Sequence, residues 1–339
     1  MDRSIQTQAC APLVDTLGRQ ITYLRLSVTD RCDLRCTYCM KARPRFLPKA
    51  DILTHEELTQ LCDAFIRRGV SKIRITGGEP LVRRDIMQLV DNLSCRLGMS
   101  SLQEICLTTN ATQLPRYADK LVRAGVRRIN VSLDTLDERT FARLTRRGDL
   151  ATTLRGIDAA DRAGLKIKIN AVALKGDNEH HLPDLIAWAH GRGFDISLIE
   201  IMPMGEVDAK RTDQFLSLST VRERLGEHYT LVETAERTGG PSRYVRLAET
   251  GGRVGFITPM SENFCGDCNR VRLTCTGQLY MCLGGAGKVD LRQALREGGR
   301  EAVDAQLDEA MAFKPEAHAF DLSARPGTAI SRSMAHTGG

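Results

Sequence analysis

Aromatic residues are scarce in this 339-residue sequence: phenylalanine, tyrosine and tryptophan make up 5% of it, with a single tryptophan. Basic residues are not interleaved with aromatic ones, so the stacking platform of a single-strand nucleic-acid binder is missing. No apolar run approaches the length that spans a bilayer, and the first residues lack the basic and apolar regions of a signal peptide. The net charge of +6 is too diffuse to indicate nucleic acid. We therefore expect a cytoplasmic protein that binds neither membranes nor nucleic acids.

Internal repeats and low-complexity segments are also absent from the sequence. Hydrophobic residues make up 42% and charged residues 27% of the chain, which is typical of a globular protein. The length exceeds that of the usual single domain, so we expect one large domain or one domain with an extension.

Cysteines, by contrast, are plentiful: there are eleven, and Cys32, Cys36 and Cys39 form a C-x3-C-x2-C pattern. Three thiolates are one short of the four that fill a 4Fe–4S cluster, so one iron would stay open to bind a small molecule. Structural zinc is the alternative, but it takes four ligands, and no fourth Cys or His lies near this triplet. With Tyr38 before its last cysteine, the triplet resembles the motif of the radical S-adenosylmethionine (SAM) enzymes.

Strand-like and helix-like patterns alternate from residue 20 to about residue 205. Strands are predicted at 21–29, 72–76, 104–110, 128–133, 166–174 and 195–203, and helices at 54–68, 83–97, 114–124, 150–163 and 179–192. Such βα units in series imply a parallel sheet. Six units are fewer than the eight of a closed TIM barrel, so we predict an α/β fold with a partial, open barrel. The first cysteine triplet directly follows the first strand, at the barrel end where chemistry is expected.

The pattern changes after Pro203. A helix is predicted at 217–228, short antiparallel strands at 229–233, 243–247 and 253–257, and two further helices at 291–297 and 300–312. We therefore expect a radical SAM barrel over residues 12–210 and a C-terminal extension over residues 211–339.

A Gly77-Gly78-Glu79-Pro80 turn closes the second predicted strand. Two glycines let the backbone approach a ligand closely, and a carboxylate with exposed amides can hold a charged amino-acid end. Alone this is an ordinary strand-end turn. Beside an open-iron cluster it is interpreted as a cradle for the methionine part of SAM.

A second metal site is indicated by Cys265, Cys268 and Cys282, in a C-x2-C-x13-C pattern. Zinc with a histidine as fourth ligand is the alternative, although His318 and His336 are distant in sequence. Cys275 could replace Cys282 as the third ligand, and spacing alone does not separate the two.

Four segments in order carry a closer resemblance: Tyr23–Cys32 (YLRLSVTDRC), Ile75–Leu81 (ITGGEPL), Cys265–Arg272 (CGDCNRVR) and the final Gly338-Gly339. Over nearly the whole chain, from about residue 12, they resemble the GTP 3′,8-cyclases, the radical SAM lyases that begin molybdenum-cofactor biosynthesis. The resemblance implies a 4Fe–4S cluster on Cys32, Cys36 and Cys39 that binds SAM. It implies a second 4Fe–4S cluster on Cys265, Cys268 and Cys282 that binds GTP, which makes Cys282 the third ligand.

Further site residues follow from the same resemblance. The positions that would contact SAM are Tyr38, Gly78, Ser132 and Met202. The positions that would bind GTP are Arg25, Arg74, Thr108, Lys168, Arg270 and Arg272. Arg270 and Arg272 would also take part in catalysis, together with Gly338 and Gly339. The expected partners are a one-electron reductant such as flavodoxin or ferredoxin and, downstream, cyclic pyranopterin monophosphate synthase; the resemblance also allows for a homodimer.

The residue types agree with a triphosphate ligand, because guanidinium groups bind phosphate oxygens bidentately. Arg25, Arg74 and Lys168 lie in predicted strands, where they could face either the barrel lumen or solvent. Gly284–Lys288 (GGAGK) does not satisfy the Walker pattern, so GTP would be a substrate to be rebuilt and not hydrolysed on a P-loop.

Two positions depart from the family pattern. Ala111 stands where the family commonly has glycine, so a left-handed backbone there would be strained, and Thr337 stands where it often has isoleucine. Two other functions remain in view: a radical SAM peptide maturase with an auxiliary cluster, and a zinc-stabilised binding module.

Overall fold

The computed structural model describes residues 11–205, 207–208, 211–262, 265–321, 330 and 332–338. These residues form one twelve-stranded sheet in the order β12-β11-β10-β1-β2-β3-β4-β5-β6-β9-β8-β7. Its two edge strands do not pair with each other, so the sheet is curved but open, as predicted. Gly339 lies outside the described residues.

Six parallel strands form the centre of the sheet: β1 (Tyr23–Ser27), β2 (Lys72–Thr76), β3 (Glu104–Thr109), β4 (Arg128–Ser132), β5 (Lys166–Ala173) and β6 (Asp195–Glu200). All six were predicted from the sequence. The largest differences are at the ends of β1 and β6, which are shorter than predicted.

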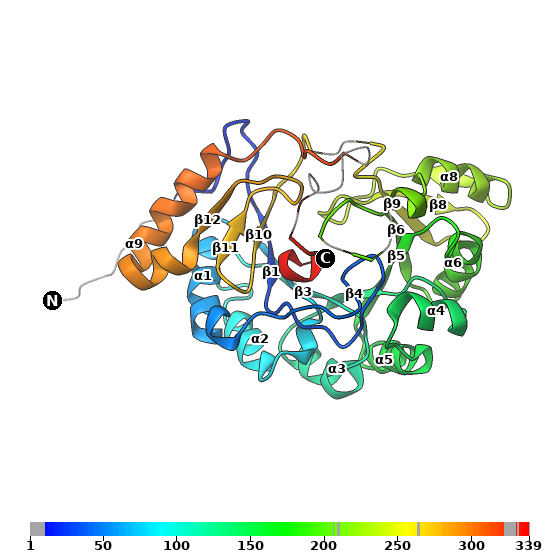
Figure 1. Cartoon of the computed structure of the whole chain (residues 1–339), viewed down its shortest axis with the longest axis horizontal. Helices are drawn as coiled ribbons and strands as arrows, with labels where there is room; N and C mark the ends of the chain where they lie inside the picture. Colours follow the sequence, from blue (N-terminus) through cyan, green and yellow to red (C-terminus); the bar gives the residue numbers. More distant parts are fainter. Residues whose placement is uncertain are drawn as a thin grey trace.

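Helices cover the outer face of this sheet (Figure 1). The predicted ones are α1 (His55–Arg67), α2 (Ile86–Ser94), α3 (Leu114–Arg123), α5 (Leu150–Arg162) and α6 (Leu182–Gly191). The predicted capping box starts α1: the Thr54 hydroxyl accepts from the Glu57 amide at 3.2 Å, and the Glu57 carboxylate accepts from the Thr54 amide at 2.8 Å. One helix was not predicted, α4 (Glu138–Thr145). Three 3-10 turns, η1 (Lys49–Asp51), η2 (Pro80–Val82) and η3 (Glu179–His181), complete this part.

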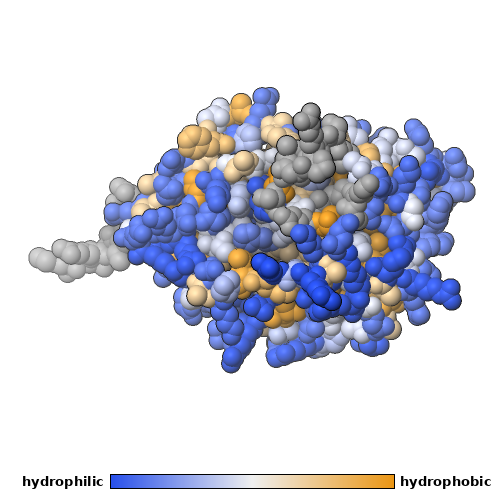
Figure 2. Space-filling model, in the orientation of Figure 1, coloured by the Kyte–Doolittle hydropathy of each residue, from blue (hydrophilic) through white to orange (hydrophobic). Residues whose placement is uncertain are grey.

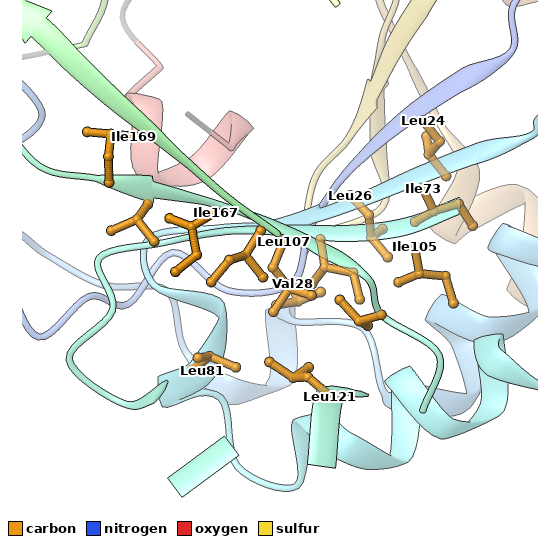
Figure 3. Packing of buried hydrophobic residues seen from close by; sticks show 14 of the residues in the cluster. Leu24, Leu26, Val28, Ile73, Leu81, Ile105, Leu107, Leu121, Ile167 and Ile169 are labelled. Carbon is orange, nitrogen blue, oxygen red and sulfur yellow. The ribbon is translucent and has the colours of Figure 1, made fainter. Parts of the chain in front are cut away.

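Side chains alternate between the two faces of the central strands. One face is apolar and packs against the helices, as Figure 3 shows for Leu24, Leu26, Ile73, Ile105 and Leu107. Full burial of each such side chain contributes roughly 1.5–3 kcal/mol. The residues between them point to the concave face, and these include the arginines and lysines singled out above.

The C-terminal part extends both edges of the same sheet. At one edge β9 (Arg253–Ile257) pairs parallel with β6, and β8 (Arg243–Leu247) and β7 (Leu231–Glu233) continue antiparallel. These three strands and the nearby α8 (Leu218–Gly226) were predicted; the short α7 (Arg211–Gln214) was not.

At the other edge β10 (Arg270–Leu273) pairs parallel with β1, followed by antiparallel β11 (Gln278–Tyr280) and β12 (Lys288–Asp290). These three strands were not predicted. The two predicted C-terminal helices lie within α9 (Leu291–Ala312), on either side of a break at Gly299 (φ 62°, ψ −145°) that only glycine adopts readily. The last element is α10 (Met334–Thr337), which Figure 1 shows at the centre of the curved sheet.

The backbone at Ala111 is left-handed, with φ 68°, so the strain expected of such a backbone at this alanine applies. The surrounding loop holds this conformation: the Ala111 amide donates to the Thr109 hydroxyl at 3.1 Å, and the Thr112 amide donates to the Asn110 side chain at 3.0 Å. Gly156 of α5 lies directly against the Ala111 carbonyl, since a Cβ at that glycine would be 1.9 Å from the oxygen.

In the part of the chain that the structure describes, no helix has both the length and the apolar character needed to span a membrane.

Candidate active site

A cavity of about 320 Å³ lies on the concave face of the sheet. It brings together all of the predicted ligand and binding residues except the two terminal glycines. Its lining includes Cys32, Cys36, Cys39, Cys265, Cys268, Cys282, Tyr38, Gly78, Ser132, Met202, Arg25, Arg74, Thr108, Lys168, Arg270 and Arg272. Residues as far apart in sequence as Arg25 and Cys282 therefore share one site.

The first cysteine triplet lies in the loop after β1, where the Cys39 and Met40 amides both donate to the Cys36 carbonyl, at 3.0 and 3.2 Å. Burial raises the pKa of the Cys36 thiol well above its ordinary value and also raises that of Cys32. Buried thiols of this kind become thiolates only when a cation offsets the charge, and a bound metal does so.

The glycine turn after β2 holds this cysteine loop in place. A Cβ at Gly77 would be 2.5 Å from the Thr29 carbonyl oxygen, and one at Gly78 would be 2.3 Å from the Arg31 carbonyl oxygen. The Gly78 and Glu79 amides donate to the same two oxygens, each at 2.8 Å. The close approach that needs glycine is therefore between the turn and the cysteine loop.

Glu79 joins the loops after β2 and β3. One of its carboxylate oxygens accepts from the Thr109 hydroxyl at 2.8 Å and the other from the Asn110 amide at 2.7 Å. Burial raises its pKa to about 7. The Asn110 side chain then donates to Asp33 of the cysteine loop at 2.7 Å, so three loops at the carboxyl ends of neighbouring strands are fastened together.

Tyr38 is held by a buried acid that the sequence did not single out. Its hydroxyl donates to Asp134 at 2.6 Å, and the other oxygen of Asp134 accepts from the Val172 amide at 2.9 Å. Burial raises the pKa of Asp134 to about 6. These bonds fix the tyrosine ring beside the first triplet.

The second triplet combines residues before β10 with Cys282 after β11. Burial would raise the pKa of Cys268, but the cations of Arg270 and Lys314 outweigh it and lower the pKa to about 7. The Lys314 ammonium lies 3.6 Å from the Cys268 sulfur. Cys275 does not line the cavity; it is fully buried, and its carbonyl accepts from the Leu53 amide. The geometry therefore groups Cys282 with the other two cysteines.

Lys314 was missed in the sequence, because it follows a long helix and matches no motif, and His318 was considered there only as a distant zinc ligand. Lys314 is buried and donates to the carbonyls of Arg270 and Met281, at 3.0 and 2.8 Å. His318 lines the cavity, and its Nδ1 accepts from the Phe320 amide at 3.3 Å.

The arrangement of thiols also bears on the metal. Among the described residues, no three His, Cys, Asp or Glu side chains converge closely enough to hold a single ion. Three thiols at each triplet would leave one iron of a 4Fe–4S cluster open, and all six thiols line the cavity. The donor set therefore fits a cluster at each triplet.

Three arginines lie side by side on the concave face. Arg272 of β10 is in register with Arg25 of β1, and Arg25 is in register with Arg74 of β2. Burial lowers the pKa of Arg25 to about 10, with Arg74 and Arg270 contributing, and lowers that of Arg272 well below its ordinary value. Of the two orientations that the sequence left open, the inward one is therefore observed.

Polar partners orient two of the cations in the lumen, Arg74 and Lys168. Arg74 donates to the Tyr23 hydroxyl and, at 3.4 Å, to the Thr108 hydroxyl. Lys168 is buried and donates to the Tyr244 hydroxyl at 2.8 Å. Among the carboxylates that line the cavity, Glu79 and Asp134 accept from the groups described above, and Glu200 accepts from backbone amides such as that of Leu218 at 3.1 Å. The lumen thus has a surplus of positive charge suited to a polyanion.

The C-terminal segment reaches this cationic row. Arg272 donates through Nη1 to the Gly338 carbonyl. Gly338 has φ 78°, and a Cβ there would be 2.0 Å from the Thr76 hydroxyl oxygen. Only glycine fits this position.

Comparison with known proteins agrees with this geometry. The family model of the radical SAM superfamily matches residues 26–189, and that of Molybdenum Cofactor Synthesis C matches residues 194–320. A GTP 3′,8-cyclase of Erythrobacter litoralis is 59% identical over 98% of this chain and 100% of its own length. One of Brucella canis is 56% identical over 99% of this chain and 100% of its own length.

Among solved structures, Streptococcus suis SuiB bound to SAM is similar with a TM-score of 0.59 and 16% identity, over 85% of this chain and 68% of SuiB. SuiB bound to the precursor peptide SuiA gives a TM-score of 0.60. These likenesses show the fold alone. The far higher identity to the cyclases, over full length, disfavours the peptide-maturase alternative.

Proposed function

Since the chain belongs to the GTP 3′,8-cyclase family of radical SAM enzymes, we propose that it converts GTP to (8S)-3′,8-cyclo-7,8-dihydroguanosine 5′-triphosphate. This lyase reaction is the first step of molybdenum-cofactor biosynthesis. The observation that carries the proposal is the cavity itself, in which two cysteine triplets share one lumen with a row of cations.

We assign one 4Fe–4S cluster to each triplet. Cys32, Cys36 and Cys39 would hold the cluster that binds SAM, and Cys265, Cys268 and Cys282 the cluster that binds the guanine of GTP. When bound, the first cluster supplies one electron that cleaves SAM and so starts radical chemistry on the ribose.

The SAM side of the lumen would be formed by Tyr38, Gly78, Ser132 and Met202. Support comes from Tyr38, which Asp134 holds in one orientation, and from Gly78, which is locked onto the cysteine loop. A fixed wall of this kind orients the methionine and adenosine parts and excludes water from a reactive intermediate.

The GTP side would be formed by Arg25, Arg74, Thr108, Lys168, Arg270 and Arg272. Guanidinium groups at neighbouring strand positions can bind the triphosphate oxygens. Arg270 and Arg272 would also act in catalysis with Gly338 and Gly339, since the Gly338 carbonyl already meets Arg272. The tail would then position the arginine and close the lumen around the nucleotide.

Finer assignments complete the proposal. Residues 12–210 would form the SAM-binding part and residues 211–339 the GTP-binding part, in a cytoplasmic protein that requires a one-electron reductant such as flavodoxin or ferredoxin. The product would pass to cyclic pyranopterin monophosphate synthase. A homodimer is compatible with this scheme.

Anaerobic turnover tests the proposal. The reconstituted and reduced protein, given SAM and GTP, should form 5′-deoxyadenosine together with the cyclised nucleotide, and ATP should not replace GTP. Cys95→Ser, at an exposed thiol outside both triplets, should behave as wild type. Zinc in place of iron, or 5′-deoxyadenosine formed without any change in GTP, would contradict the assignment.

A further inference from the structure

We infer that the segment after the first triplet, residues 40–49, is the docking surface for an acidic one-electron carrier protein. This segment is called the cationic loop below. The inference rests on the proposed function, because a SAM-cleaving cluster needs an electron from outside the protein. It adds where that electron enters and which kind of carrier the surface fits.

The charge of the cationic loop is of one sign. Its ten residues, MKARPRFLPK, include Lys41, Arg43, Arg45 and Lys49 and no Asp or Glu. All four cations are exposed. In Figure 2, strongly hydrophilic atoms cover the face on which Figure 1 shows the blue loop that follows β1.

The cationic loop is anchored so that its cations face outward. The Leu47 amide donates to the Asp30 carboxylate at 2.7 Å. The Phe46 ring is contacted by two guanidinium groups, with Arg31 at 5.6 Å and Arg35 at 4.9 Å from the ring centre. These contacts attach the apolar residues of the loop to the segment that carries the cysteines. The cationic surface is therefore fixed relative to the first triplet.

Its position suits electron entry. Only Met40, which is buried and whose amide donates to the Cys36 carbonyl, separates Cys39 from the exposed Lys41. A carrier on this surface is thus one residue along the chain from a cluster ligand. Electron transfer then needs no bond change: the carrier loses one electron and the cluster gains it.

A groove of about 540 Å³ provides the shape for such a contact. It lies between the cationic loop and the C-terminal segment, and its lining includes Lys41, Arg43, Arg45, Phe46 and Ser333. Carboxylates on a partner can enter a groove edged by cations, and transient redox complexes bury small, charge-steered interfaces.

Other anionic partners fit this surface less well. Peripheral membrane binding needs apolar side chains that insert into lipid, and nucleic-acid binding uses aromatic stacking. The exposed large apolar side chains of the described residues lie elsewhere: Val14, Leu17, Met99, Val232 and Phe313. A folded acidic protein requires neither kind of side chain, because charge complementarity suffices for a transient complex.

The test uses full-length reconstituted protein without GTP, and reduced flavodoxin as the probe. The triple variant Lys41→Glu, Arg43→Glu, Arg45→Glu reverses the surface. The matched control reverses three exposed cations of α3, with Arg116→Glu, Lys120→Glu and Arg123→Glu. Flavodoxin affinity and the rate of cluster bleaching are measured at low and high salt, and dithionite serves as a small reductant.

For wild type and the α3 control, we expect that flavodoxin reduces the cluster at a rate that falls steeply as the salt concentration rises. At low salt, flavodoxin should bind to the loop variant and reduce its cluster at least tenfold more slowly than in wild type. This rate should hardly depend on salt, and the rate of reduction by dithionite should be unchanged. Equal flavodoxin rates in wild type and loop variant would overturn the inference. The inference would also be overturned if the loop variant lost binding to anionic vesicles or RNA while flavodoxin still reduced its cluster at the wild-type rate. This test contains no GTP, so its result does not depend on cyclisation. Failure to cyclise GTP in a separate turnover assay would count against the proposed function only.

Discussion

Gly338→Ala is the sharpest test of the C-terminal tail. The glycine has φ 78°, where an L-residue costs roughly 1–2 kcal/mol. The added methyl would also meet the Thr76 hydroxyl oxygen at 2.0 Å, and Thr76 is only 1% exposed and has little room to move. The variant therefore opposes docking of the tail in two independent ways.

The contact at risk is the bond from Arg272 to the Gly338 carbonyl. A hydrogen bond to a charged group contributes roughly 1.5–3 kcal/mol. The backbone cost alone reduces the docked population by a factor of about 5–30, and the clash adds to it. We expect GTP cyclisation to fall at least tenfold at equal iron content, with an unchanged Tm, because α10 is a short terminal helix outside the main core.

The control variant Gly176→Ala separates the cost of a left-handed backbone at an alanine from the steric clash with Thr76. Gly176 has φ 72°, and a Cβ there would have open space around it. It should lower Tm slightly and leave turnover unchanged. Product and 5′-deoxyadenosine are measured for both variants. Wild-type turnover in Gly338→Ala, or a loss that tracks a lowered Tm, would refute the reasoning.

Three further outcomes are expected. Cys36→Ser should abolish SAM cleavage but keep about half the iron, since the two proposed clusters would be held by separate triplets; iron analysis that finds none left would contradict this. Arg272→Ala should weaken GTP binding by roughly 1.5–3 kcal/mol while SAM titrates as in wild type, and unchanged GTP affinity would remove the arginine from the site. Gly156→Ala should lower the free energy of unfolding by about 1–3 kcal/mol by overpacking, although alanine is the better helix former. Denaturant unfolding checks this against Gly191→Ala, which has open space and should be neutral or slightly stabilising.

The βα frame could be predicted because its signals are local. β2 has the predicted bounds, and α1 begins at the predicted Thr54 capping box. Alternating apolar residues and glycines at helix ends act within a few positions of the chain, so a single sequence shows them. The short helix α4 was not predicted, because the local sequence pattern over it is weak.

The strands β10 to β12 could not be predicted in the same way. β10 has four residues, RVRL, and its partner β1 lies about 240 positions earlier. Nothing local distinguishes such a strand from a loop beside a metal site. The break within α9, by contrast, could be predicted, because Gly298 and Gly299 mark it locally and Gly299 departs from helical geometry.

The pairing of β10 with β1 also explains why the inward direction of the arginines was undecided in the sequence. Strand alternation places Arg25 and Arg74 on one face but does not say which face is buried. Once β10 extends the sheet beside β1, Arg272 joins the same row, and both triplets line the cavity that contains it. Three adjacent guanidinium groups repel one another and lose hydration, which is unfavourable for the protein alone. A fold that retains them in one lumen, while the nearby carboxylates accept from other groups, is organised around a polyanion that supplies the missing charge.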